Sequence, residues 1–254
     1  MTTAAYVPSR SALSKVQRRL TQWRAARPVN LRFNAPILSI TFDDFPVSAG
    51  ALGARILESH SARGTYYAAA GLADEEGPCG RNFNRADIRR LIAAGHEIGC
   101  HTYDHADCAK RDVFDSLKDL AKNRDALNEM GCYEPSRTLA YPYGETRQKL
   151  KNNLPPRFYS ARGILPGLNI GRTDLTQLRA YPLFGAGGIG RAVEALKCAA
   201  KRKAWMIGFT HDISDTPSPW GTSAADLDAL LRAAKTLSVV VLPVTAALER
   251  RIET

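Results

Sequence analysis

The sequence lacks any hydrophobic run long enough to cross a bilayer, and none of its cysteines forms a C-x-x-C pair. The longest late apolar stretch, Val239 to Val244, is short and contains Pro243, and the amino terminus has no continuous hydrophobic segment typical of a secretory signal. The five cysteines are an odd number, which does not suit a disulfide framework. These absences predict a reduced, cytoplasmic protein with no signal peptide or transmembrane helix.

Acidic residues are absent from the first 42 positions, which carry much of the formal net charge of +10. Apolar side chains occupy one side of a predicted helix here, namely Leu13, Val16, Leu20 and Trp23. Basic and polar side chains occupy the other side, namely Lys15, Arg18, Arg19 and Gln22. We expect residues 1–34 to form a basic amphipathic extension whose residues 10–27 bind an anionic membrane surface peripherally. A helix packed on the rest of the protein, or an organelle transit peptide, would give the same pattern, and no base-reading motif indicates nucleic acid.

Residues 35–254 have the composition of one folded domain. The chain of 254 residues is 44% hydrophobic and 24% charged, which allows a large core without disulfides. Strand patterns alternate with helical patterns along this part of the sequence. The strands are expected near 37–42, 64–70, 95–99, 138–141, 157–160, 178–182, 204–210 and 237–241. The helices are expected near 49–60, 84–94, 112–130, 145–152, 188–202 and 223–236. Repeated β-α units predict an α/β fold with a parallel sheet, a distorted (β/α) barrel of seven to eight units that is closed or incomplete.

Clusters of polar residues follow four of the predicted strands, at the ends where such barrels form their active sites. They are the pair Asp43 and Asp44, the segment His101 to His105, the turn Tyr141 to Gly144, and the pair His211 and Asp212. Histidines four residues apart share one side of a helical turn, and a carboxylate from elsewhere would complete a metal site with room for water. Each motif alone also suits a structural histidine or a strand-ending aspartate. Their joint position at strand ends favours a catalytic metal site.

The motifs TFDD, GHEIGCHTYDH, YPYG and FTHD occur in this order over residues 41 to 212. As an ordered set they resemble the motifs of the polysaccharide deacetylases, carbohydrate esterase family four, which carry the NodB homology domain. The resemblance covers residues 35–254. It implies a distorted (β/α) barrel and a metal-dependent hydrolase that removes acetyl groups from the N-acetylated amino sugars of a glycan or glycoconjugate.

Amide hydrolysis needs an activated water, a stabilised oxyanion and a proton for the departing amine. The resemblance implies that Asp44, His101 and His105 hold one divalent ion, which lowers the pKa of its water and polarises the acetyl carbonyl. Zinc fits such a ligand set best, and cobalt, nickel and iron are also compatible.

The resemblance further implies that Asp43 is the general base and that His211 is the acid that protonates the amine. Tyr143 would offer its backbone N–H to the oxyanion, in a turn shaped by Pro142 and Gly144. Considered alone, Tyr143 is equally well explained as a packed aromatic, and His211 as a residue at the entry of a helix.

Substrate contacts are expected from Pro142, Tyr143 and Trp220. Trp220 lies in a loop between Pro219 and Gly221, where its ring would stack on a sugar or fold back over the core. Three further polar residues have structural interpretations: Glu97 as the partner of a nearby arginine, and His96 and His60 as structural or solvated histidines.

One position departs from the family pattern. Ala140 stands where the family usually carries an arginine that orients the catalytic aspartate. Arg162, at the end of the next predicted strand, is the candidate to replace it as a catalytic-site residue. The departure motivates an alternative function, a catalytically silent relative that binds glycans or scaffolds polysaccharide assembly. Because the base, the three ligands and the acid are all present, the sequence favours the N-deacetylase.

Overall fold

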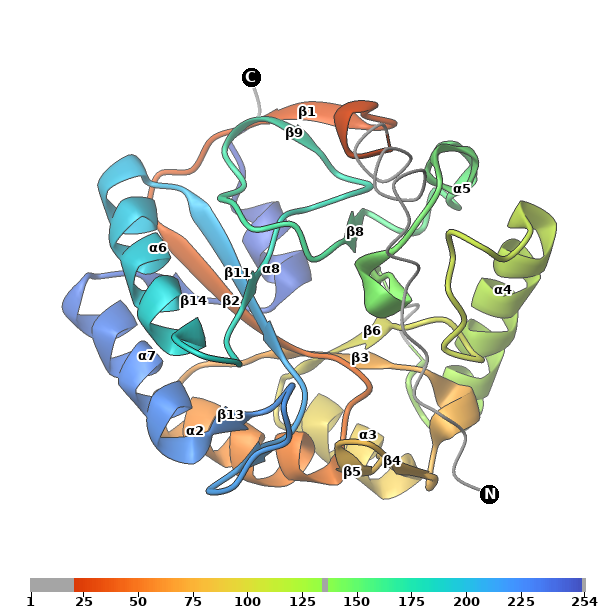
Figure 1. Cartoon of the computed structure of the whole chain (residues 1–254), viewed down its shortest axis with the longest axis horizontal. Coiled ribbons are helices and arrows are strands. Elements are labelled where there is room, and N and C mark those ends of the chain that lie inside the picture. The colour runs from red at the N-terminus through yellow and green to blue at the C-terminus, as the bar shows by residue number, and fades with distance from the viewer. Residues whose placement is uncertain (1–20, 134–136, 253–254) are drawn as a thin grey trace.

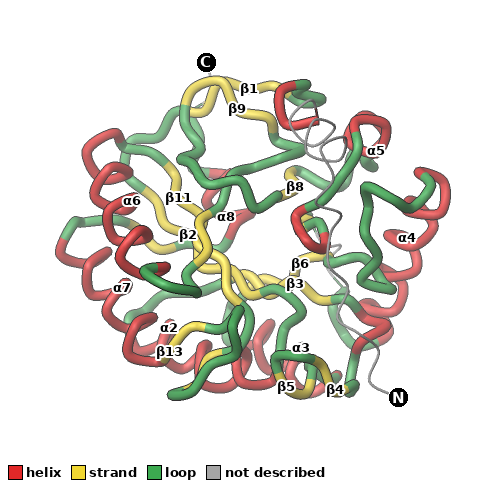
Figure 2. Tube along the Cα trace, viewed as in Figure 1, coloured by secondary structure: helices red, strands yellow, loops and turns green. Residues whose placement is uncertain are grey.

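The structure, a computed structural model, describes residues 21–133 and 137–252. Its centre is a curled sheet in which every pairing is parallel, and helices cover its outer side (Figures 1 and 2). The strands are β2 (Ile37–Phe42), β3 (Thr65–Ala68), β6 (Glu97–Cys100), β7 (Thr138–Ala140), β8 (Ser160–Arg162), β10 (Tyr181–Pro182), β11 (Trp205–Thr210) and β14 (Val240–Val241). All eight lie at or within a few residues of the strands expected from the sequence, and the predicted α/β class is confirmed.

The sheet is an incomplete barrel. Seven strands follow the order β10-β11-β2-β3-β6-β7-β8, and β14 pairs with the first residues of β2. One edge of β2 pairs with β11 over its whole length, so its other edge is shared by β14 at the start and β3 at the end. The strands β8 and β10 at the two ends do not pair. Arg162 at the end of β8 instead forms an isolated bridge with Leu178, which precedes β10 in the chain.

The connecting helices lie where the helical patterns predict them. They are α2 (Ala54–Ser59), preceded by a π-helical turn (Ala49–Gly53), α3 (Arg85–Ala93), α4 (Val113–Glu129), α5 (Gln148–Asn153), α6 (Gly188–Arg202) and α7 (Ala224–Thr236). Several begin at a side-chain cap, as when Asp112 accepts a hydrogen bond from the Phe114 N–H at 2.8 Å. A further helix, α8 (Val244–Glu249), follows Pro243 and was not expected.

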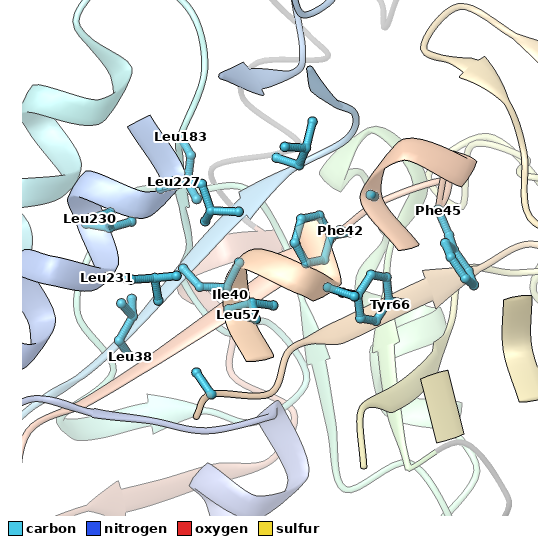
Figure 3. Close-up of a cluster of buried hydrophobic side chains, with 14 of the residues drawn as sticks. Leu38, Ile40, Phe42, Phe45, Leu57, Tyr66, Leu183, Leu227, Leu230 and Leu231 are labelled. Atoms are coloured by element: carbon cyan, nitrogen blue, oxygen red, sulfur yellow. The ribbon is translucent and has the colours of Figure 1, made fainter. Parts of the chain in front are cut away.

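Alternate residues of β2 face two different hydrophobic clusters, although all six are buried. Leu38, Ile40 and Phe42 point outward to α2 and α7, where they meet Leu57, Leu227, Leu230 and Leu231 (Figure 3). On the other side, Ile37 packs with Trp205 in a second cluster. The strand β2 is therefore packed on both faces. This packing fixes the position of Asp43 and Asp44, which follow its carboxyl end.

Three short pairings were not expected from the sequence. The pair β1 (Pro28–Leu31) and β9 (Gly171–Asp174) is antiparallel, β4 (Glu76–Gly77) and β5 (Gly80–Arg81) form a hairpin, and β12 (Ile213–Ser214) pairs with β13 (Thr222–Ser223). Through β1, Leu31 and Phe33 join the cluster around Trp205. The described end of the expected extension 1–34 is thus built into the fold, while most of the predicted basic helix lies outside the described residues. Within residues 21–133 and 137–252, no helix is long and apolar enough to cross a membrane.

Candidate active site

Two histidines and one aspartate converge at the carboxyl ends of β2 and β6. The Nε2 atoms of His105 and His101 lie 3.0 and 3.4 Å from Asp44 Oδ1. One ligand atom from each of these three residues lies within 4.8 Å of the others. The structure thus brings together the three residues that the sequence analysis expects to hold a metal.

The chemistry of these atoms suits a divalent cation. His101 is buried, and its Nδ1 lies 2.8 Å from the Ala140 carbonyl oxygen. An Nδ1–H that donates to this carbonyl leaves the lone pair of Nε2 directed at Asp44, as in many histidine ligands of zinc. Asp44 Oδ1 is buried and has no partner apart from the two imidazole nitrogens, which are themselves available to bind a cation together with it. Two imidazoles and a carboxylate with open positions fit zinc and neighbouring transition metals.

Backbone strain is concentrated in the loops that carry these groups. Asp44, Thr102, His105 and Tyr143 all have left-handed backbones, with φ values of 58°, 61°, 52° and 59°. Such a conformation costs a non-glycine residue on the order of 1 kcal/mol or more. Four strained residues around one point indicate that the surrounding contacts hold a defined arrangement of side chains.

Charges within the site favour the ionised form of both aspartates. Burial alone raises the pKa of Asp44, but His105 and His101 outweigh it and bring that pKa well below its usual value. Burial likewise raises the pKa of Asp43, and Arg162, His101 and His211 reverse the effect, so its pKa lies below the usual value. For His105, burial lowers the pKa but the Asp44 carboxylate raises it further, above the usual value.

Arg162 occupies the position that the sequence analysis expects. Its Nη2 donates a hydrogen bond to Asp43 Oδ1, and the two side chains are only 1% and 7% exposed. Its guanidinium carbon lies 5.1 Å from the ring centres of both Tyr67 and Phe209. Ala140 on β7 has no side chain that could reach Asp43, and the arginine that contacts this carboxylate is Arg162 of β8.

His211 is held by the loop that follows it. Its backbone N–H and its Nδ1 both lie 3.2 Å from the Trp220 carbonyl oxygen, and its Nε2 lies 3.9 Å from Asp44 Oδ2. The loop is folded around the buried Asp212, which accepts hydrogen bonds from the Ser218 hydroxyl at 2.5 Å and its N–H at 2.8 Å. A Cβ on Gly221 would lie 2.4 Å from Asp212 Oδ1, so this close packing requires glycine.

The PYG turn lies beside His105. Tyr143 packs its ring against His105 in an edge-on contact, with centroids 4.8 Å apart. Gly144 also has a left-handed backbone (φ 68°), and Ile164 covers it so closely that a Cβ would lie 2.3 Å from the isoleucine. The Trp220 side chain is 40% exposed, so its ring does not fold back into the core.

The three polar residues considered structural lie in other contacts. His96 Nε2 is 3.1 Å from Glu58, and His60 Nε2 is 2.7 Å from Asp228. The expectation of an arginine partner for Glu97 is wrong. Its carboxylate accepts hydrogen bonds from the hydroxyls of Thr65, Thr138 and Thr245 instead, because three strand and helix ends meet around it.

Sequence comparison identifies a family for the first half of the chain. The polysaccharide deacetylase family model matches residues 31–154. The peptidoglycan-N-acetylglucosamine deacetylase PgdA of Listeria monocytogenes is 23% identical over 118 residues, 46% of this chain and 23% of that protein. A peptidoglycan-N-acetylglucosamine deacetylase of Bacillus cereus is 28% identical over 116 residues, 44% of this chain and 38% of that protein. The chain therefore matches less than half the length of either relative.

Structural comparison extends the similarity to the rest of the fold. A family 4 acetyl xylan esterase from Clostridium thermocellum, in complex with a cobalt ion, has a TM-score of 0.57 at 20% identity, over 84% of this chain and 90% of that one. A mutant of a family 4 pseudoenzyme with restored enzymatic activity has a TM-score of 0.58 at 14% identity, over 89% of this chain and 73% of that one. The family indicated by the motifs is confirmed for residues 31–154, which match the polysaccharide deacetylase family model, and the fold is that of carbohydrate esterase family four.

Proposed function

We propose that this protein is a metal-dependent hydrolase that removes acetyl groups from N-acetylated amino sugars of a glycan or glycoconjugate. The observation that carries the proposal is the convergence of Asp44, His101 and His105 beside a separate, ionised Asp43. A site of this kind combines a place for a Lewis acid with a second carboxylate that is not one of the metal ligands. The names of the Listeria and Bacillus relatives, both peptidoglycan-N-acetylglucosamine deacetylases, support an amino-sugar substrate.

In this proposal Asp44, His101 and His105 hold one divalent ion, zinc first, with cobalt, nickel and iron as compatible alternatives. When bound, the ion supplies a more acidic water and polarises the acetyl carbonyl. Asp43 would act as the general base toward the attacking water. A carboxylate with a lowered pKa is a weak base in isolation, so its effect would depend on its fixed position. Arg162 provides that fixed position through a charge-assisted hydrogen bond.

His211 is proposed to give a proton to the departing amine. Its Nδ1 rests on the Trp220 carbonyl, which leaves Nε2 on the side of Asp44, where the reaction would occur. The backbone N–H of Tyr143 is proposed to donate to the oxyanion, in a turn held by Pro142 and by the Tyr143–His105 ring contact. The exposed ring of Trp220, with Pro142 and Tyr143, would contact the apolar face of a sugar.

The alternative is a catalytically silent relative that binds glycans or scaffolds polysaccharide assembly. A pseudoenzyme with the same fold exists among the structural neighbours, and Ala140 departs from the family pattern. The buried contact between Arg162 and Asp43 weakens this alternative, because a module that only binds has no use for an oriented base. We therefore favour the enzyme.

Acetate release from a panel of N-acetylated and O-acetylated saccharides, with and without chelator, tests the proposal. The enzyme is expected to release acetate from N-acetylated amino sugars, to lose this activity with chelator, and to recover it with zinc or cobalt. Binding of the same saccharides with no acetate released at any metal load would favour the silent relative.

Association of residues 10–27 with an anionic membrane surface is a separate proposal, based on charge and amphipathic pattern alone. Because β1 is part of the fold, the test should delete only residues 1–20. Reduced binding of the shortened protein to vesicles containing phosphatidylserine would support the idea, and unchanged binding would reject it.

A further inference from the structure

A buried carboxylate on α4 holds the loop between the two histidines. Asp119 Oδ2 accepts a hydrogen bond from the Tyr103 N–H at 2.6 Å, and Asp119 Oδ1 accepts one from the Asp104 N–H at 3.2 Å. The side chain of Asp119 is 2% exposed. Asp119 is not one of the metal-ligand candidates, and its oxygens contact the loop backbone and Arg111 instead.

Arg111 completes this contact from the far end of the same loop. Its Nη1 lies 2.8 Å from Asp119 Oδ1, and its Nη2 lies 3.0 Å from Asp104 Oδ2. The Arg111 guanidinium therefore links the Asp119 carboxylate on α4 to the side chain of Asp104, the residue before His105. Arg111 is 30% exposed, so it closes the network on the solvent side.

The loop needs such support because of its backbone. Thr102 and His105, on either side of the two tethered N–H groups, both have left-handed φ values, 61° and 52°. Strain of this kind persists only where neighbouring contacts fix it. The Tyr103 carbonyl accepts a hydrogen bond from the Gly71 N–H at 3.1 Å, so the turn is held from Gly71 as well as from Asp119. His105 follows this turn directly in the chain, so a change in the turn would move its ring.

We propose that Asp119, held by Arg111, is a positioning residue that sets the His101–His105 loop in the geometry that binds metal. The inference rests on the proposed metal site but concerns a different residue. A carboxylate is required because it accepts two backbone N–H groups and one guanidinium at once. A carboxamide in its place has one acceptor oxygen, and its NH₂ group would face an N–H donor.

The test is cobalt binding to the folded protein, followed by the visible absorption of Co²⁺, which reports the ligand geometry without any turnover. For Asp119→Asn we expect the cobalt dissociation constant to rise about 10- to 100-fold, as for other residues that orient metal ligands, with a changed spectrum. Asp125→Asn is the matched control, because it removes an exposed carboxylate from the same helix. It should bind cobalt as the wild type does.

The variant Arg111→Ala distinguishes a positioning role of Arg111 from an effect of its charge alone. Removal of a positive charge near the site would by itself strengthen cation binding, whereas loss of the contacts that Arg111 makes with Asp104 and Asp119 should weaken it. This variant is also the safeguard if Asp119→Asn does not fold, because Arg111 is partly exposed. Weaker cobalt binding with a changed spectrum supports the proposal. Wild-type or tighter binding by Arg111→Ala, or a wild-type spectrum and affinity for folded Asp119→Asn, overturns it. Failure of the wild type itself to bind cobalt would instead refute the proposed metal site.

Discussion

Arg162 of β8 donates a hydrogen bond to Asp43 at the end of β2, four strands away in the sheet order. Both side chains are buried, and the guanidinium carbon lies 5.1 Å from the ring centres of Tyr67 and Phe209. A cation from β8 therefore lies beside this aspartate, whereas Ala140 on β7 offers none. The carboxylate and the cation form a unit that affects both stability and the proposed chemistry.

Replacement of Arg162 by alanine should lower the free energy of unfolding by about 3–5 kcal/mol, because it leaves a buried carboxylate without its partner. Turnover should also fall, whereas the metal should stay bound because the three ligands are unchanged. Urea denaturation, metal analysis and acetate release measure these effects. Arg172→Ala, an exposed arginine on β9, is the control. Full activity of Arg162→Ala would show that the metal and the backbone suffice to position Asp43.

Asp43→Asn should retain one metal per chain and lose about 10²–10⁴-fold in turnover, because a carboxamide cannot accept the proton of water. His211→Ala should likewise keep the metal, with turnover lower by roughly 10²-fold or more. Metal content and initial rates are measured on the same preparations. Loss of metal in Asp43→Asn, as complete as that expected for Asp44→Asn, would mean that base and ligand are wrongly assigned.

We propose two separable roles for Trp220, one for its side chain and one for its carbonyl oxygen. Trp220→Ala keeps the carbonyl that orients His211, so it should raise KM for oligosaccharides with little change in kcat. Gly221→Ala should instead lower kcat, because the new Cβ would collide with Asp212 and displace the loop. The comparison of kcat and KM for the two variants checks this. An unchanged KM in Trp220→Ala would remove the ring from the substrate site.

A second buried ion pair ties β9 to α5 and should make stability depend on pH. Lys151 Nζ lies 2.8 Å from Asp174 Oδ2, and the lysine side chain is 0% exposed. Burial by itself raises the pKa of Asp174, but hydrogen bonds from Lys151, Thr176 and the Arg27 backbone bring it below the ordinary value of 3.8. A lowered pKa in the folded state means that the carboxylate stabilises the protein above pH 3.8, and that this contribution is lost as the pH falls through the lowered pKa.

Asp174→Asn should therefore reduce the free energy of unfolding at pH 7 by about 3 kcal/mol, the lower part of the range for a broken buried pair. The lower part is expected because Lys151 keeps hydrogen bonds to Thr21, Arg24 and Gln177. The variant should also lose less stability than the wild type as the pH drops below about 4. Denaturation curves at several pH values measure this. Parallel curves for the two proteins would show that Asp174 is not responsible for acid sensitivity.

The sequence allowed the barrel to be predicted because its signals are local. Apolar strands such as Ile37–Phe42 and capped helices such as Val113–Glu129 can be recognised within a dozen residues, and the polar clusters follow directly after them. The pair β1–β9 could not be predicted in this way, because two strands about 140 residues apart pair through backbone groups that carry no sequence signal.

Asp119 was missed for a related reason. An apolar face on α4 indicates a packed helix, but the helix also buries Asp119 and Asn123 on its inner side. Polar residues at core-facing positions were a signal that could have been followed. Their partners were not predictable, since they are backbone groups of the loop after β6 and of the end of β3. The role of the Ala140 carbonyl in orienting His101 likewise has no side-chain signature.

An anomalous difference map from crystals soaked with zinc, recorded on both sides of the zinc absorption edge, would show whether a metal ion binds at the proposed site. We expect one strong peak bonded to Asp44, His101 and His105 at about 2.0–2.2 Å. The same experiment with His101→Ala should show no peak there, whereas His60→Ala, which removes a histidine paired with Asp228, should leave the peak in place. A wild-type crystal with no zinc between these three residues, or with zinc held elsewhere, would contradict the proposed metal centre.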